Sequence, residues 1–138
     1  MSRTMVKDWM TSDPIMVTSN EKLPNVYWMM IENKIRRLLV VDDEVLVGIV
    51  TLEDLRRAEP SITFGLDLVR ISDVLVNLPV RQLMSKNPKT ITPNAPLIEA
   101  ARLMLENKIS ALPVMELDIP VGIITESDIF RALIEREK

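Results

Sequence analysis

Apolar residues recur along two stretches of the chain at intervals that fit one face of an α-helix. In the first stretch they occupy positions i, i+3, i+4, i+7 and i+8, namely Leu23, Val26, Tyr27, Met30 and Ile31. The second stretch copies this stripe with Leu97, Ala100, Ala101, Met104 and Leu105. Because this spacing is typical of an amphipathic helix, the pattern predicts two helices that each bury one face.

Two further stretches are rich in β-branched residues and are interrupted by a short turn. LLVV, the polar turn at 42–44 and VLVGIV predict a hairpin over residues 38–50, and LPVMELDIPVGII predicts its counterpart over residues 112–124. A short helix is expected to begin just after each hairpin, following Thr51 in the first case and Thr125 in the second. Each hairpin therefore leads directly into a helix.

A turn and a short strand are expected before each amphipathic helix. The turns are predicted at Asp13-Pro14 and Asn87-Pro88, and the strands that follow them end near Thr18 and Thr92. The order of elements is then strand, helix, strand, strand, helix, and it occurs twice along the chain.

The second half of the chain repeats the first at the level of residues. Shifted by about 74 positions, the chain matches itself without a gap and with about 20 identities over about 53 positions, a signal of internal duplication. A repeat with three short strands leaves its apolar sheet face incompletely covered. We therefore expect an α+β fold in which two tandem β-α-β-β-α repeats pack as an intramolecular pseudo-two-fold pair.

The duplication also predicts the boundaries of the parts. The first repeat is expected over residues 1–58, a partly helical linker over 59–79, and the second repeat over 80–138. Within the linker a break is expected at Glu59-Pro60. One or two helices are predicted after that break from the spacing of Leu66, Val69, Leu75 and Leu78.

Composition and charge narrow the possible functions. The chain has 138 residues, 47% of them hydrophobic, a formal net charge of −3, and neither cysteine nor histidine. The missing histidine and cysteine remove the usual general base, the commonest metal ligands and any disulfide framework. The acidic balance disfavours nucleic acid and anionic membrane surfaces as partners. No apolar run approaches the roughly 20 residues that span a bilayer, so a cytoplasmic location is expected by elimination.

The repeated motifs resemble those of a known family, the tandem cystathionine-β-synthase (CBS) domains, whose paired arrangement is called a Bateman module. The resemblance lies in the openings VKDWMTSDP and VRQLMSKNP, in IENKI and LENKI, and above all in GIVTLED and GIITESD. It covers nearly the whole chain, and the linker is also similar to that of acetoin-utilisation accessory proteins. The family implies regulation: paired domains bind adenosine-containing ligands in clefts between the repeats and often assemble as flat dimers.

The resemblance also implies which residues hold the ligand. In the first half Asp54 would hold the ribose, with Thr51 near the ribose or phosphate and Ile49 against the adenine. In the second half Asp128, Thr125 and Ile123 take the same positions. The phosphate would be contacted by basic residues in the first half, Arg36 and Arg37, where the second half has Ser110 and Ala111 and therefore departs from a symmetric site. Lys89 is a further candidate for the same cleft, although an ordinary surface lysine explains it as well.

Each Thr-x-x-Asp motif has a simpler explanation beside the ligand site. The spacing fits a capping box, in which the threonine hydroxyl and the carboxylate satisfy backbone N–H groups at the start of a helix. A carboxylate can also accept from both hydroxyls of a ribose, and a helix N-terminus favours phosphate, so the two roles are compatible. Gly48 and Gly122 occupy the same place in the two repeats, and each marks either close approach by a ligand or tight packing.

Two functions from different classes fit these observations. The first is a non-enzymatic sensor that binds AMP, ADP, ATP or, less in keeping with Arg36 and Arg37, S-adenosylmethionine, and that acts on a regulated protein the sequence does not identify. The alternative is a structural dimerisation or protein-interaction scaffold with a vestigial ligand site. Trp28 and Met29 lie opposite the predicted buried stripe, so they are candidates for a homodimer interface, with partial burial under the linker as the alternative. No nucleophile–base pair or metal-ligand cluster points to an enzyme.

Overall fold

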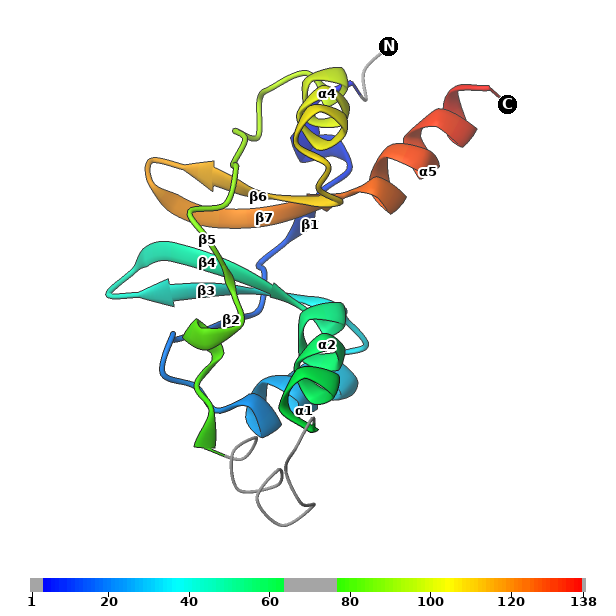
Figure 1. The fold of residues 1–138 in the computed structure, drawn as a ribbon. Helices are drawn as coiled ribbons and strands as arrows, with labels where there is room; N and C mark the ends of the chain where they lie inside the picture. The colour runs from blue at the N-terminus through cyan, green and yellow to red at the C-terminus, as the bar shows by residue number, and fades with distance from the viewer. Residues whose placement is uncertain (1–3, 64–76, 138) are drawn as a thin grey trace. The chain divides into compact units, whose positions relative to one another are not determined.

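The computed structural model describes residues 4–63 and 77–137, and these residues divide into two compact units (Figure 1). One unit lies within residues 15–87 and contains the hairpin of β3 (Arg37–Asp42) and β4 (Val45–Thr51). The other combines residues 1–14 with 88–138 and contains the hairpin of β6 (Ala111–Glu116) and β7 (Ile119–Thr125). We call them the β3–β4 unit and the β6–β7 unit.

Within its described residues, 15–63 and 77–87, the β3–β4 unit has a four-stranded sheet and two α-helices. Its strands run in the order β2-β3-β4-β5, with β2 (Met16–Val17) parallel to β3 and β5 (Ser85–Lys86) antiparallel to β4. The helices are α1 (Leu23–Asn33) and α2 (Leu52–Thr63). Their apolar sides and one sheet face form a core that includes Val26, Met30, Leu38, Val40 and Val50.

The β6–β7 unit repeats this plan with a smaller sheet. Its strands run in the order β1-β7-β6, with β1 (Thr11–Ser12) antiparallel to β7. The short strand expected near Thr92 is reduced to a single parallel bridge between Ile91 and Val114. The helices are α4 (Leu97–Asn107) and α5 (Glu126–Arg136). The core includes Ile91, Ala100, Met104, Leu112, Val114 and Ile124.

The two opening segments, residues 6–14 and 80–88, each complete the hairpin found in the other half of the sequence. The first contains the 3-10 helix η1 (Val6–Asp8) and β1, and the second contains η2 (Val80–Gln82) and β5. The valine that begins each segment, Val6 or Val80, is fully buried in the core of the unit it joins. The compact units therefore divide the chain after Pro14 and Asn87, whereas the predicted boundaries at 58 and 80 follow the duplication.

The buried face of each amphipathic helix is rotated from the predicted stripe. In α1, Leu23, Val26 and Met30 are buried as expected, but Tyr27 and Ile31 are each 46% exposed, and Met29 packs against the core instead. The same rotation exposes Leu105 in α4 and turns Leu103 toward the core. At about 100° per residue, positions i+4 and i+8 lie on one side of the line through i, i+3 and i+7, and position i+6 lies on the other side, so a rotation that exposes the first two turns the third toward the core. The sequence suggested that Met29 lies on the outer face of the helix. This prediction is wrong, because Met29 packs against the core.

Helix α2 continues past the predicted break. It runs to Thr63 through Glu59 and Pro60, so the break expected there is wrong. A proline inside a helix removes one backbone hydrogen bond and tends to kink the helix, but the hydrogen bonds on both sides of it can persist. The helices predicted from Leu66, Val69 and Leu75 lie outside the described residues, and Leu78 packs against the core of the β3–β4 unit.

Candidate functional site

The Thr-x-x-Asp motifs lie where each hairpin passes into a helix. β4 ends at Thr51 and α2 begins at the next residue, and β7 ends at Thr125 with α5 following in the same way. The residue after each threonine donates its backbone N–H to a carbonyl across the hairpin. Leu52 donates to the carbonyl of Arg36 at 2.8 Å, and Glu126 donates to that of Ser110 at 3.0 Å. These matched bonds place both motifs at equivalent strand ends.

Both motifs form a capping box, as the simpler explanation predicted. In the first, the backbone N–H of Thr51 donates to Oδ2 of Asp54 at 2.9 Å, and the backbone N–H of Asp54 donates to Oγ1 of Thr51 at 3.1 Å. In the second, the N–H of Thr125 donates to Oδ2 of Asp128 at 2.8 Å, and the N–H of Asp128 reaches Oγ1 of Thr125 at 3.4 Å. One oxygen of each carboxylate therefore holds the helix start, and Oδ1 faces away from that bond.

An arginine one turn further along each helix contacts the other carboxylate oxygen. Arg57 donates from Nη2 to Oδ1 of Asp54 at 2.6 Å, and Arg131 donates to Oδ1 of Asp128. The arginine side chains are 76% and 60% exposed, whereas those of the aspartates are 13% and 3% exposed. This pair was not among the residues predicted from the sequence, although Asp followed three residues later by Arg occurs in both repeats and favours an ion pair on a helix.

One face of each hairpin presents the remaining candidate residues. In the β3–β4 unit Arg37 lies opposite Thr51 and Leu39 lies opposite Ile49, so these four side chains share the sheet face that does not form the unit's own core. In the β6–β7 unit the equivalent pairs are Ala111 with Thr125 and Pro113 with Ile123. The two faces match in backbone and differ in charge, because alanine replaces Arg37.

Arg36 lies just before β3 and is not part of this face. Its guanidinium forms an ion pair with Glu53 in the first turn of α2, and both side chains are more than half exposed. The hydrogen bond from Arg36 lowers the pKa of Glu53 below its ordinary value. Of the two arginines, Arg37 is therefore the one whose strand position places it beside Thr51.

Lys89 lies in an exposed stretch of the β6–β7 unit, two residues before the Ile91 bridge. No hydrogen bond or ion pair within the described residues brings it to either motif. The ordinary surface lysine that the sequence left open as an explanation is sufficient for what the structure shows.

The two strand glycines are explained by close packing within each unit. A Cβ atom on Gly48 would lie 2.5 Å from Sδ of Met84 and 2.9 Å from the carbonyl oxygen of Ser85. A Cβ atom on Gly122 would lie 2.7 Å from Sδ of Met10 and 2.8 Å from the carbonyl oxygen of Thr11. Each glycine therefore makes room for a methionine and a strand of the opening segment, which is the tight-packing alternative.

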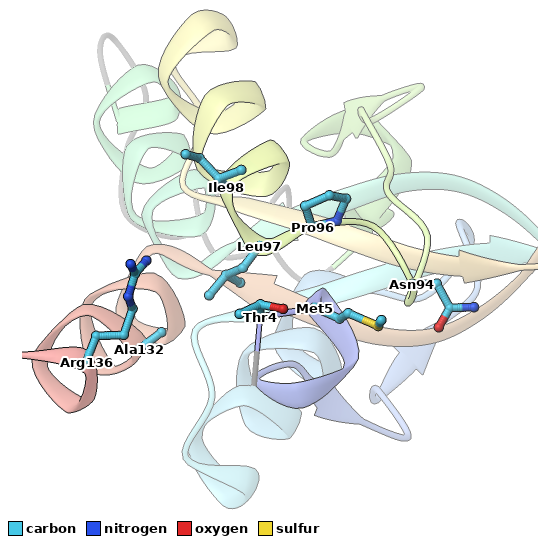
Figure 2. Close-up of a pocket in the computed structure, with 8 residues that line it drawn as sticks. All are labelled: Thr4, Met5, Asn94, Pro96, Leu97, Ile98, Ala132 and Arg136. Atoms are coloured by element: carbon cyan, nitrogen blue, oxygen red, sulfur yellow. The ribbon is translucent and has the colours of Figure 1, made fainter. Parts of the chain in front are cut away.

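A separate hollow of about 340 Å³ lies in the β6–β7 unit, away from its motif. Figure 2 shows that its walls come from the chain before η1, from the start of α4 and from α5. The lining is mainly apolar, with Arg136 as its charged side chain. None of the lining residues is a carboxylate, so this hollow lacks the group that would bind a ribose diol.

Two features that residues 4–63 and 77–137 lack bear on other functions. These residues contain no cluster of three or more aspartate, glutamate, histidine or cysteine side chains arranged to hold a metal ion. Among the same residues, no helix is both long and apolar enough to cross a membrane.

A hairpin that leads into a helix through Thr-x-x-Asp, present in both units, is the arrangement that the resemblance to CBS domains implies. The family model for the CBS domain matches the chain twice, over residues 6–61 and 80–135. The chain therefore belongs to the CBS domain family, with two tandem repeats in a mixed α+β fold.

Two curated relatives are longer proteins that contain a similar segment. The chain is 32% identical over 130 residues to the uncharacterized protein MJ1225 of Methanocaldococcus jannaschii, a match over 92% of this chain and 46% of that protein. It is 33% identical over 137 residues to a homoserine O-acetyltransferase of Methanohalobium evestigatum, a match over 98% of this chain and 25% of the enzyme. The chain thus spans less than half of either relative.

Three solved structures resemble the chain over nearly all of its length. CBSX2 in complex with AMP has a TM-score of 0.77 and 28% identity, over 98% of this chain and 99% of that one. An acetoin utilization protein (AcuB) from Vibrio cholerae has a TM-score of 0.76 and 30% identity, over 96% and 92%. The CBS domain pair of MJ0100, in complex with 5-methylthioadenosine and S-adenosyl-L-methionine, has a TM-score of 0.76 and 29% identity, over 98% of each chain.

Proposed function

We propose that this chain is a non-enzymatic regulatory module that binds an adenosine-containing ligand at its Thr-x-x-Asp motifs. AMP, ADP and ATP are favoured over S-adenosylmethionine. One observation carries the proposal: each unit places a carboxylate and a threonine hydroxyl together at the N-terminus of a helix, at the end of a strand that also carries an isoleucine.

Each of these groups matches a part of an adenosine ligand. The Oδ1 atoms of Asp54 and Asp128 would accept hydrogen bonds from ribose hydroxyls, while Oδ2 keeps its bond to the helix start. The helix N-terminus favours a phosphate through its N–H groups and its dipole. Ile49 and Ile123 would contact the adenine ring. Arg37 supports the preference for a phosphorylated ligand at the first motif, because it lies beside Thr51 on the sheet face.

The similar structures support the same class of ligand without identifying the member. CBSX2 was solved with AMP, and the MJ0100 pair with 5-methylthioadenosine and S-adenosyl-L-methionine. All three ligands contain adenosine. Two of them carry no phosphate, so the choice between phosphorylated and unphosphorylated ligands depends on residues of this chain such as Arg37.

A regulatory role is proposed in place of catalysis because the chain has no histidine and no cysteine. Those residues supply most general bases and thiol nucleophiles. Where a relative is named as an enzyme, as for the homoserine O-acetyltransferase, the matched segment is a quarter of that enzyme. A regulated partner, whether fused or separate, is therefore part of the proposal.

A thermal-shift titration against AMP, ADP, ATP, S-adenosylmethionine and NADH tests the proposal. A ligand at about 100 times its dissociation constant raises the free energy of unfolding by about 2.7 kcal/mol, so binding produces a saturable shift. Asp54→Asn and Asp128→Asn should abolish it, because asparagine keeps an oxygen for the helix start but offers an NH₂ donor where the ribose needs an acceptor. Asp43→Asn, in an exposed turn, is the matched control. No shift with any of the five compounds would refute the proposal.

The alternative is a dimeric scaffold whose ligand site is vestigial, and one observation favours it. Trp28 is 59% exposed on α1, beside the exposed Tyr27 and Ile31, and such a patch often marks a protein contact. The scaffold predicts a homodimer that Trp28→Glu dissociates, together with no nucleotide-dependent shift. Arg102→Glu, at the equivalent position of α4, is the control in sedimentation velocity. A monomeric unmodified protein would refute the scaffold and the homodimer alike.

A further inference from the structure

The strongest unexplained feature of the motifs is the arginine that covers each carboxylate. Arg57 and Arg131 contact the same oxygen, Oδ1, that a ribose diol would use. Each arginine is mostly exposed and each aspartate is mostly buried, so the guanidinium lies on the solvent side of the carboxylate. A ligand that approaches from solvent therefore meets the arginine first.

The arginine is also well placed to meet a phosphate. Side chains on a helix lean toward its N-terminus, so an arginine in the second turn reaches the first turn, as the contacts with Asp54 and Asp128 show. The first turn is where a phosphate is most favourable. A small rotation of the guanidinium would exchange one anionic partner for another.

We infer that Arg57 and Arg131 select for phosphorylated ligands by occupying the ribose-binding oxygen in the empty protein and turning to the phosphate when the ligand binds. Adenosine displaces the guanidinium from the carboxylate and offers it no anionic group in exchange. AMP displaces it and supplies a new counter-charge. The inference rests on the proposed function and names the residues that set its specificity.

The test compares the affinity for adenosine with the affinity for AMP in Arg57→Gln/Arg131→Gln, by calorimetric titration. Without the guanidinium, adenosine should bind a few-fold more tightly, since an exposed ion pair no longer competes for the carboxylate. AMP should bind more weakly, since a charge-assisted contact to its phosphate is lost. Together these changes should reduce the preference for AMP over adenosine by about tenfold or more.

The control removes the same charge from the same helices without touching the carboxylates. Arg56→Gln/Arg136→Gln lowers the net charge equally, from the position before Arg57 in α2 and from the end of α5. It should leave the preference for AMP within about twofold of the unmodified protein, because the ion pairs with Asp54 and Asp128 are kept and salt weakens the effect of other exposed charges.

A second measurement observes the arginines directly. In a ¹⁵N NMR spectrum of arginine side chains, the Nε resonances of Arg57 and Arg131 should shift when AMP is added, and those of Arg56 and Arg136 should not. An unchanged preference for AMP in Arg57→Gln/Arg131→Gln, or unshifted resonances at saturating AMP, would overturn this inference and leave the proposed function in place. A protein that binds neither compound would refute the proposed function and the inference with it.

Discussion

The β3–β4 unit and the β6–β7 unit share their backbone plan, their capping boxes and their Asp–Arg ion pairs, but two other polar pairs of the first unit are absent from the second. In the first, Arg36 forms an ion pair with Glu53, and in the second the aligned residues are Ser110 and Ser127. Both members of the ion pair are therefore replaced by serine in the second unit. The same holds for Asp42, whose carboxylate accepts from the hydroxyl and N–H of Ser19, because the aligned residues are Glu116 and Pro93.

What the units share is instead required by the fold. Both have the capping box, a buried valine at the start of the opening segment, and a glycine packed against a methionine. The contrast indicates that the duplicated residues build the scaffold, whereas Arg36, Arg37 and Glu53 near the first motif have no charged counterpart in the second half. Substitutions in the shared scaffold are therefore expected to lower the stability of the two units equally. Substitutions in the polar pairs that only one unit has are expected to affect that unit alone.

The largest effect is expected when the strand glycines are replaced. Gly48→Ala and Gly122→Ala should each lower the free energy of unfolding by about 3 kcal/mol, because the new methyl group collides with a methionine sulfur and with a backbone carbonyl. Urea denaturation measures the loss. Adding Met84→Ala should recover part of the Gly48→Ala loss, since the carbonyl of Ser85 stays in place. Wild-type stability in either alanine variant would show that these contacts relax freely.

The next largest loss of stability is expected when the buried valine of either opening segment is replaced. Val6→Ala and Val80→Ala each remove buried methyl groups at a cost of about 2 kcal/mol. Because Val6 lies in the core of the β6–β7 unit, its replacement should speed hydrogen exchange in β6 and β7 more than in β3 and β4, and Val80→Ala should do the reverse. The opposite pattern would mean that each opening segment stabilises the repeat that follows it in sequence.

Much of the secondary structure could be predicted from the sequence, because it depends on local patterns. The hairpins, the helix starts after Thr51 and Thr125 and the capping boxes all follow from residues a few positions apart. The duplication strengthened each prediction, since the same pattern occurred twice. The rotated faces of α1 and α4 were missed because the surrounding core decides which flank of an apolar stripe is covered.

The long-range features could not be predicted in the same way. Nothing local shows that residues 6–14 pair with β7 instead of β4, because strand partners are decided by tertiary packing. The reason for a glycine at position 48 is the packing of Met84 against it. Met84 lies 36 positions away in the sequence, so this contact is visible only in the structure. The contact between Arg57 and Asp54 was within reach of the sequence, because its i, i+3 spacing is local.

A smaller, stabilising effect is expected at the hairpin turns. Asp43 and Glu44 have φ angles of 50° and 68°, and Leu117 and Asp118 have 51° and 64°, so both turns hold ordinary residues in the left-handed region. Asn-Gly at either turn should raise the free energy of unfolding by about 1 kcal/mol. The gain should be larger at residues 117–118, because leucine tolerates this region less well than aspartate. Leu117→Ala, which keeps the strain, is the control in thermal denaturation.

The smallest effect concerns acid stability and separates the two units. The hydroxyl and N–H of Ser19 hold the pKa of Asp42 below its ordinary value of about 3.9. Because the pKa is lower in the folded state than in the unfolded state, this stabilisation is present in full above about pH 4 and is lost as the pH falls through the folded pKa. Ser19→Ala should therefore flatten the decline of Tm between about pH 4 and pH 2.

The hydrogen bond from Arg36 also lowers the pKa of Glu53, so Glu53 would contribute to the same acid response. The comparison is therefore made in a Glu53→Gln background, which removes this contribution and leaves that of Asp42. Glu116→Gln is the matched control in the β6–β7 unit, because the aligned Pro93 has neither a hydroxyl nor an N–H to donate. It should leave the slope of Tm against pH close to that of the background. A slope that falls equally in Ser19→Ala and Glu116→Gln would show that acid sensitivity does not distinguish the units.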